Sequence, residues 1–224
     1  MRLRPLLKPV LNRILPPVTK WYLRKPRRFR YQDLELTVQP GVFHPGMYFS
    51  SKYLAEHVLR LDLAGKRVLE IGTGSGFLSM LAARGGAEVV ATDISPLAVA
   101  NARANAEANG VEMVVVESDL FAGLKGERFD VVLVNPPYYP GTPQTDEEHA
   151  WYCGPEWEYF QRLFEGLGEW LVADARVLMV VSEDVAVGEI RRIAEGKGWW
   201  MEEVDRSKRW GEWNYVFGFG KGEK

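Results

Sequence analysis

Residues 67–76 read Arg-Val-Leu-Glu-Ile-Gly-Thr-Gly-Ser-Gly, a short apolar run that passes directly into alternating glycines. The residues that follow, from Phe77 to Ala83, are mostly apolar and favour a helix. A glycine-rich turn between a strand and a helix is the setting in which such a motif binds a ligand. Glycine permits the sharp turn and lets the backbone approach that ligand without a clash from Cβ. We therefore expect a binding site where this strand ends.

The spacing of the glycines separates two classes of cofactor. Gly72, Gly74 and Gly76 alternate, whereas the dinucleotide motif places its third glycine three residues after the second, a position that Phe77 occupies here. This spacing argues against NAD and favours S-adenosylmethionine. The chain resembles the class I methyltransferases over about residues 37–219, because their first motif is an acidic residue followed by Gly-x-Gly-x-Gly. The residues that this resemblance implies for cofactor binding at the turn are Glu70, Gly72, Thr73, Gly74 and Gly76.

Two later strands end in carboxylates. The strand at residues 88–92 ends in Asp93, about twenty residues after the glycine turn, where nucleotide-binding α/β folds place the carboxylate that accepts the ribose hydroxyls. The strand at residues 112–116 is followed by Asp119, which the resemblance assigns to the adenine amino group. Either carboxylate taken alone also fits a helix cap or a loop. The other residues that we expect in the cofactor site are Ile94, Ser118, Leu120 and Asn135.

Residues 135–138 read Asn-Pro-Pro-Tyr and follow a fourth apolar strand, residues 129–134. Amide and aromatic amine nitrogens are poor nucleophiles because their lone pair is delocalised, so an enzyme has to hold both N–H bonds. Asn135 offers a side-chain oxygen, and Pro136 lacks an N–H but keeps a carbonyl within the restricted Pro-Pro pair. The motif favours methylation of a nitrogen, although a turn that ends a buried strand also fits it. In families with this motif these oxygens bind the target nitrogen and the aromatic ring packs on its plane, which the resemblance carries to Asn135, Pro136 and Tyr138.

The order of the expected elements predicts an α/β fold. Strands alternate with helices along the chain, which indicates a doubly wound, mostly parallel sheet with helices on both faces. After a long helix at about residues 156–171 we expect a strand at 176–181 and a helix at 185–195. The last two strands, at 199–204 and 214–219, have a connection too short for a parallel crossover and should form an antiparallel hairpin. The resemblance likewise implies a Rossmann-like sheet of seven strands with an antiparallel last strand.

Residues 36–51 read Leu-Thr-Val-Gln-Pro-Gly-Val-Phe-His-Pro-Gly-Met-Tyr-Phe-Ser-Ser and precede the first expected helix of the domain. This stretch is similar to the glutamine N5-methyltransferases that modify peptide-chain release factors, among the wider small-domain methyltransferases. Gly46 stands where that family has Arg, and Cys153-Gly154 stands where it has a Gly-Gly pair. The resemblance implies that the aromatic residues of this stretch line the cofactor or acceptor pocket, although ordinary core aromatics fit as well. Its expected residues are Tyr48, Phe49, Ser50, Pro137, Tyr138 and Tyr139.

The charge of the chain is unevenly distributed. Residues 1–30 hold ten of its 28 Lys and Arg and none of its 30 Asp and Glu, although the formal net charge is -2. Between Arg2 and Arg30 cations alternate with apolar and aromatic residues, as on nucleic-acid-binding surfaces. RNA or ribosome contact, a membrane-surface helix, and an arm folded against the acidic body all fit this composition. We expect a basic arm at 1–36 and a methyltransferase domain at 37–224.

The composition predicts a cytoplasmic protein without a metal. Cys153 is the only cysteine, so an intrachain disulfide is excluded, and the three histidines show no metal-ligand spacing. The apolar runs are shorter than the roughly eighteen residues that a membrane span needs. Nearly half of the 224 residues are apolar, enough for one sizeable core.

The sequence therefore predicts methyl transfer from S-adenosylmethionine to a planar nitrogen. A glutamine side chain of a protein is the first expected acceptor, and the exocyclic amine of an RNA or DNA base is the second, because each is planar with two N–H bonds. A protein that binds the cofactor without turnover, as one half of a heterodimer, is an alternative of another class.

Overall fold

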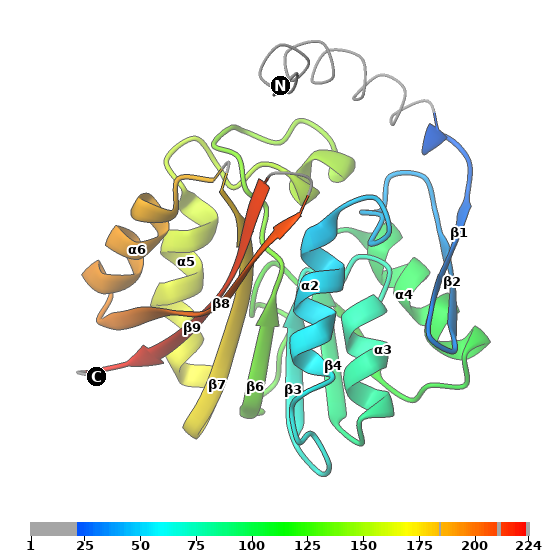
Figure 1. The fold of residues 1–224 in the computed structure, drawn as a ribbon, viewed down its shortest axis with the longest axis horizontal. Coiled ribbons are helices and arrows are strands. Elements are labelled where there is room, and N and C mark those ends of the chain that lie inside the picture. Colours follow the sequence, from blue (N-terminus) through cyan, green and yellow to red (C-terminus); the bar gives the residue numbers. More distant parts are fainter. Residues whose placement is uncertain (1–21, 184, 210–211, 223–224) are drawn as a thin grey trace, which may run out of the picture.

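Seven strands form one mixed sheet in the computed structural model, which describes residues 22–183, 185–209 and 212–222 (Figure 1). Their order across the sheet is β5-β4-β3-β6-β7-β9-β8. The strands are β3 (Arg67–Ile71), β4 (Glu88–Asp93), β5 (Val114–Glu117), β6 (Phe129–Val134), β7 (Leu171–Ser182), β8 (Trp199–Arg209) and β9 (Glu212–Lys221). The helices are α2 (Phe49–Val58), α3 (Phe77–Arg84), α4 (Pro96–Ala108), α5 (Glu158–Gly166) and α6 (Val187–Gly196).

The strand directions confirm the predicted doubly wound sheet. β3 to β7 run parallel to one another, whereas β9 lies antiparallel between β7 and β8. Several boundaries differ from the prediction, and β8 continues to Arg209 rather than ending at 204. The helix expected at residues 156–171 ends as a 3-10 turn at Leu167–Trp170, and β7 begins at Leu171 rather than 176. The early part of β7 was missed because it pairs irregularly with β6 and contains Asp174 at a φ of 60°.

The central strands are buried on both faces, which explains their continuous apolar sequences. Successive side chains of a strand point to opposite faces. Val68 and Leu133 thus pack with α2 and α3, while Leu69 and Val132 pack with α5 and α6. Figure 1 shows these two helix layers on either side of the sheet.

A small hairpin of β1 (Arg27–Tyr31) and β2 (Leu34–Val38) is attached to the sheet through α4. The attachment is a row of asparagines four residues apart on one helix face. Asn101 accepts from Gln39 N at 3.1 Å, Asn105 from Thr37 N at 2.9 Å and Asn109 from Glu35 N at 3.0 Å. The amide groups of Asn101 and Asn109 also donate to carbonyls of β2, so the side chains replace a neighbouring strand.

The hairpin includes residues that the sequence assigned to the basic arm. Residues 27–38 pack on the body of the protein, and the boundary expected after residue 36 falls within β2. Residues 1–21 of the arm lie outside the described residues. Among the described helices, none combines the length and apolar character that crossing a bilayer requires.

We expect Asn105→Ala to lower the free energy of unfolding by about 2 kcal/mol or more. Asn105 is buried, and its loss leaves Thr37 N–H and Ser75 C=O without their hydrogen bonds of 2.9 Å each. Urea denaturation monitored by circular dichroism measures the change. Glu107→Ala, at an exposed position of the same helix, is the matched control and should change stability by less than about 0.5 kcal/mol. Equal effects of the two changes would contradict a structural role for the asparagine row.

Candidate active site

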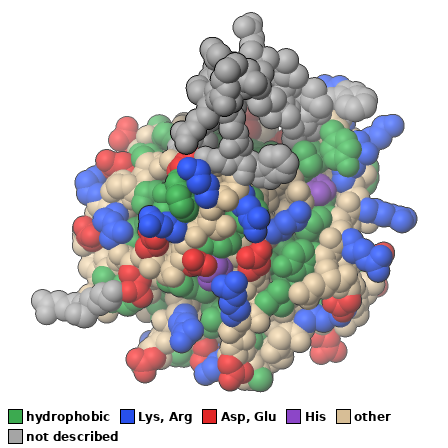
Figure 2. All heavy atoms as spheres, in the orientation of Figure 1, with side chains coloured by type: hydrophobic (Ala, Val, Ile, Leu, Met, Phe, Trp, Pro, Cys, Tyr) green, Lys and Arg blue, Asp and Glu red, His purple; other side chains and the backbone are tan. Residues whose placement is uncertain are grey.

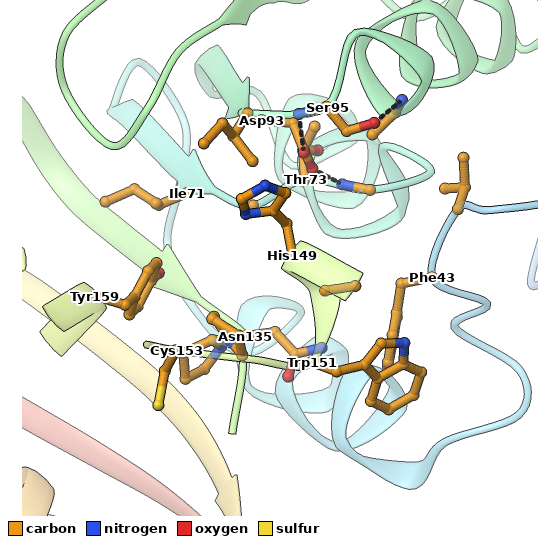
Figure 3. Close-up of a pocket in the computed structure, with 18 of the residues that line it drawn as sticks. Phe43, Ile71, Thr73, Asp93, Ser95, Asn135, His149, Trp151, Cys153 and Tyr159 are labelled. Atoms are coloured by element: carbon orange, nitrogen blue, oxygen red, sulfur yellow. Dashed lines mark hydrogen bonds between the residues drawn. The ribbon is translucent and has the colours of Figure 1, made fainter. Parts of the chain in front are cut away.

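A cavity of about 320 Å³ opens at the carboxyl ends of the central strands (Figure 3). It lies where the chain order reverses, because β4 and β5 extend the sheet on one side of β3 and β6 and β7 extend it on the other. Ligands of open α/β sheets bind at this switch point. The cavity is therefore in the position that the fold itself favours for binding.

Most of the residues predicted for the site come together around this cavity. The predicted residues that line it are Glu70, Gly72, Thr73, Gly74, Asp93, Ile94, Ser118, Asp119, Leu120, Asn135, Pro136, Pro137 and Tyr138. The predicted residues that do not belong to its lining are Tyr48, Phe49, Ser50, Gly76 and Tyr139.

The glycine turn has a backbone that only glycine adopts easily. Gly72, Gly74 and Gly76 have φ values of 75°, 55° and 82°, all in the left-handed region. A Cβ on Gly72 would meet no atom within 4 Å, so this turn leaves open space for a ligand. A Cβ on Gly76 would lie 3.2 Å from the Ala102 methyl group. Gly76 therefore begins α3 and allows it to pack closely on α4, away from the cavity wall.

A buried carboxylate holds the glycine turn against α3. Glu70 Oε2 accepts from Thr73 Oγ1 at 2.8 Å, from Ser79 N at 2.9 Å and also from Ser79 Oγ. Only 3% of Glu70 is exposed. Burial outweighs these donors and raises the pKa of Glu70 from 4.5 to about 7. The turn and the first helical turn thus share one anchor.

Asp93 closes the other side of the turn. Its Oδ2 accepts from Gly74 N at 2.8 Å and its Oδ1 from Ser95 N at 3.0 Å. Burial raises the pKa of Asp93, against the lowering effect of these N–H groups and of nearby His149. Each carboxylate oxygen can accept more than one hydrogen bond, so Asp93 retains acceptor capacity toward the cavity that it lines.

Asp119 lies at the end of the cavity near β5. Its Oδ2 pairs with the Arg162 guanidinium at 2.7 Å, and both residues line the cavity. The ion pair links the β5 loop to α5. It thereby restricts the carboxylate without burying it.

Asn135 is oriented by hydrogen bonds on both sides of its amide. Its Nδ2 donates to Ser51 Oγ at 3.2 Å, and its Oδ1 accepts from Tyr138 Oη at 2.7 Å. The Tyr138 hydroxyl also lies 3.3 Å from the carbonyl oxygen of Val180 on β7. Burial raises the pKa of the Tyr138 phenol, so it remains a donor at neutral pH.

Residues 139–157, which we call the strap, cover the cavity between β6 and α5. Tyr139 N donates to Trp151 O at 2.8 Å, and Cys153 N donates to Tyr139 O at 2.9 Å. The strap also contains a 3-10 turn at Asp146–Ala150, and Figure 3 shows the His149 ring between Asp93 and Asn135. Tyr139 itself is 41% exposed and is not part of the lining.

An aromatic cluster joins the strap to the segment before α2. The Tyr48 ring lies 4.8 Å from Phe43 and 4.9 Å from Trp151, and the Phe43 and Trp151 rings lie 5.4 Å apart. Tyr48 therefore supports the cavity wall from behind, while Phe43 and Trp151 form it. Phe49 instead stacks on Tyr53 of its own helix at 5.4 Å.

Several lining residues were not predicted from the sequence, among them Phe43 and Ser51, and four more that come from the strap and α5. These four are His149, Trp151, Tyr159 and Arg162. His149 and Trp151 follow the Asn-Pro-Pro-Tyr motif within fifteen residues, which is the only local signal for them. Tyr159 and Arg162 are three residues apart on one face of α5. Within the described ranges, no three His, Cys, Asp or Glu side chains are grouped as metal ligands.

Comparison with known proteins identifies similar sequences. The sequence model described as "Methyltransferase small domain" matches residues 33–189. A Methanocaldococcus jannaschii protein named as a candidate N5-glutamine methyltransferase is 41% identical over 110 residues, 49% of this chain and 53% of that protein. The ribosomal RNA small subunit methyltransferase C of Chromohalobacter salexigens is 30% identical over 207 residues, 87% of this chain and 57% of that one. The chain thus spans about half the length of these relatives.

Solved structures share the fold. The T. thermophilus 16S rRNA N2 G1207 methyltransferase, in complex with AdoMet and guanosine, has a TM-score of 0.65 at 23% identity, covering 89% of this chain and 50% of that one. The E. cuniculi Mtq2–Trm112 complex, responsible for methylation of the eRF1 translation termination factor, has a TM-score of 0.62 at 25% identity, covering 81% of this chain and 99% of the matched chain. These matches support the doubly wound architecture.

We expect the stability difference between wild type and Glu70→Gln to depend on pH. The folded-state pKa of about 7 lies above the ordinary 4.5, so the stability that Glu70 contributes is complete below pH 4.5 and is lost as pH rises through 7. A shift of this size corresponds to at most about 3 kcal/mol. Urea denaturation of both proteins at pH 5 and pH 8 measures it. A difference that is the same at both pH values would show that Glu70 does not titrate in this range.

Proposed function

Since the chain belongs to the methyltransferase small domain family, we propose that it is an S-adenosylmethionine-dependent N-methyltransferase. One observation carries the proposal. The Asn-Pro-Pro-Tyr residues line the same cavity as the glycine turn and Asp93. Groups suited to holding a methyl donor and groups suited to holding a planar nitrogen therefore face one space.

The residues on the donor side of the cavity fit S-adenosylmethionine. The open space at Gly72 admits the ligand next to the backbone, and Asp93 offers carboxylate oxygens for the ribose hydroxyls. Asp119 is our candidate for the adenine amino group. When bound, S-adenosylmethionine supplies an electrophilic methyl group on its sulfonium.

The acceptor side of the cavity contributes to catalysis by orienting the nitrogen that receives the methyl group. Asn135 Oδ1 and the Pro136 carbonyl are acceptors for the two N–H bonds of an amide or aromatic amine. Ser51 and Tyr138 hold the Asn135 side chain in one direction, so the nitrogen that it binds is held as well. Orientation of reactants can contribute about 7 to 11 kcal/mol at best, without a strong general base.

Two acceptors fit this geometry. A glutamine side chain is the first candidate, supported by the relative named for N5-glutamine methylation and by the structural match named for methylation of a termination factor. The exocyclic amine of an RNA base is the second, supported by the relative named for ribosomal RNA methylation, whose alignment includes 87% of this chain. A base within a duplex would first have to be extruded, so single-stranded or loop RNA is the easier substrate.

Two substitutions separate the donor and acceptor roles. We expect Asn135→Ala to abolish methyl transfer and leave S-adenosylmethionine affinity nearly unchanged, because the amide holds the acceptor. Asp93→Ala should mainly weaken cofactor binding, because its carboxylate faces the ribose position. Isothermal titration with S-adenosylhomocysteine and a methyl-transfer assay measure both effects. Equal loss of cofactor binding in the two variants would overturn the assignment.

The acceptor is identified by transfer of a radiolabelled methyl group from S-adenosylmethionine into cell extract. Asn135→Ala is the control for background labelling. Label that protease digestion releases identifies a protein acceptor, and label that nuclease digestion releases identifies a nucleic acid. Cofactor binding without label in any fraction would instead favour a scaffold without turnover.

A further inference from the structure

Cations and aromatic rings lie on both faces of the end of the β8–β9 hairpin and on the adjoining start of α2, beside the acceptor side of the cavity. We call this surface the cation–aromatic band, and its residues are Arg206, Lys208, Arg209, Trp213, Phe49 and Lys52. It extends from the β8–β9 hairpin to the first turns of α2. Figure 2 shows Lys and Arg side chains in a row across the face on which α2 lies.

The cations of the β8–β9 hairpin lie over aromatic rings. Lys208 is opposite Trp213 in the strand register, and its Nζ lies 5.1 Å from the ring centre. The Arg206 guanidinium lies 5.3 Å from the same ring. On the other face of β8, the Arg209 guanidinium lies 5.4 Å from the centre of the Phe49 ring. These contacts are within the range of cation–π attraction and place charge and ring surface side by side.

The band continues along α2 toward the N-terminal hairpin. Lys52 Nζ lies 5.6 Å from the centre of the Phe29 ring on β1. Next to β1, the Arg27 guanidinium lies 3.6 Å from the centre of the Tyr22 ring. Phe29 is buried, so the part of the band at Lys52 contributes positive charge and no ring surface for stacking.

Carboxylates lie close to part of this charge, and Glu212 is opposite Arg209 in the strand register. Arg206 pairs with Glu203 at 3.4 Å. Lys208 and Arg209 are exposed, and neither forms an ion pair with another residue in the part of the chain that the structure describes. Because the formal net charge of the whole chain is -2, attraction of a polyanion depends on local groups of this kind.

The band borders the acceptor side. Phe49 is the first residue of α2, and Ser51 in the same helical turn accepts the hydrogen bond from Asn135. The carbonyl of Trp213 accepts from Glu183 N at 2.8 Å, directly after the end of β7. A chain bound along the band would therefore pass close to Asn135.

We propose that the cation–aromatic band binds single-stranded RNA. Exposed Lys and Arg contact phosphates, and aromatic rings and guanidinium planes stack on bases that are not paired. An acidic peptide would use the cations but would leave the rings without a partner. The inference concerns binding alone and does not rest on the proposed methyl transfer.

The test uses fluorescence anisotropy of the full chain with a labelled, single-stranded RNA oligonucleotide at several salt concentrations. The variant Lys208→Glu/Arg209→Glu reverses two charges of the band. We expect it to weaken binding at least about tenfold and to reduce the slope of log affinity against log salt by about 1.4, since each phosphate contact contributes about 0.7. The matched control is Lys125→Glu/Arg128→Glu, which makes the same charge change at exposed positions just before β6, at the opposite end of that strand from Asn135.

Trp213→Ala is a second variant for the same RNA-binding assay, and it leaves the charge of the band unchanged. Loss of base stacking should weaken binding about fivefold or more and leave the salt slope unchanged. The proposal fails if wild type does not bind the RNA at low salt, or if the band and control variants weaken binding equally. It also fails if poly-glutamate displaces the RNA as well as unlabelled RNA does. Cofactor binding by all variants, measured with S-adenosylhomocysteine, keeps this result separate from the proposed catalysis.

Discussion

The site depends on the hydrogen bonds that the buried carboxylate of Glu70 accepts. This carboxylate lies at the end of β3, and one of its oxygens holds both the Thr73 hydroxyl in the glycine turn and the backbone and hydroxyl of Ser79 in α3. The backbone of a turn with three glycines can adopt many conformations in the unfolded chain. Glycine therefore loses more conformational entropy on folding than other residues. The anchor compensates by joining strand, turn and helix at one buried point. The cavity takes its shape from the turn held in this way.

The other walls of the cavity come from segments far apart in the sequence. The asparagine row on α4 fixes β2, and Asn105 also donates to the carbonyl of Ser75 within the glycine turn. The segment after β2 carries Phe43 and Tyr48, which pack against Trp151 of the strap. A movement of α4 would therefore displace both the floor and the edge of the cavity. The donor side of the cavity therefore depends on contacts among α4, β2, the glycine turn and the segment that follows β2.

Short sequence patterns predicted the elements whose structure is determined by residues close together in the chain. The strands at 67–71 and 129–134 follow from apolar runs, and the position of Asp93 follows from its distance from the glycine turn; the structure has all three where expected. The wall residues His149 and Arg162 depend instead on how the strap and α5 fold back over the strand ends, which no short pattern records. Tyr48 illustrates the same limit. Its sequence position suggested the pocket, whereas its packing behind Phe43 is decided by a contact with a residue about a hundred positions later.

The groups around Asn135 determine what kind of catalysis the acceptor side can perform. The hydroxyl of Ser51 is neutral. The phenol of Tyr138 has a raised pKa, and its O–H group donates a hydrogen bond to the Asn135 oxygen. Neither group can act as a strong base at neutral pH. A carbonyl oxygen has two lone pairs, so Asn135 can accept from Tyr138 and from one N–H of a bound amide or amine at the same time. The hydroxyl of Tyr138 thus directs the second lone pair instead of competing for it, and we infer that Asn135 acts on the acceptor through the direction of its hydrogen bonds.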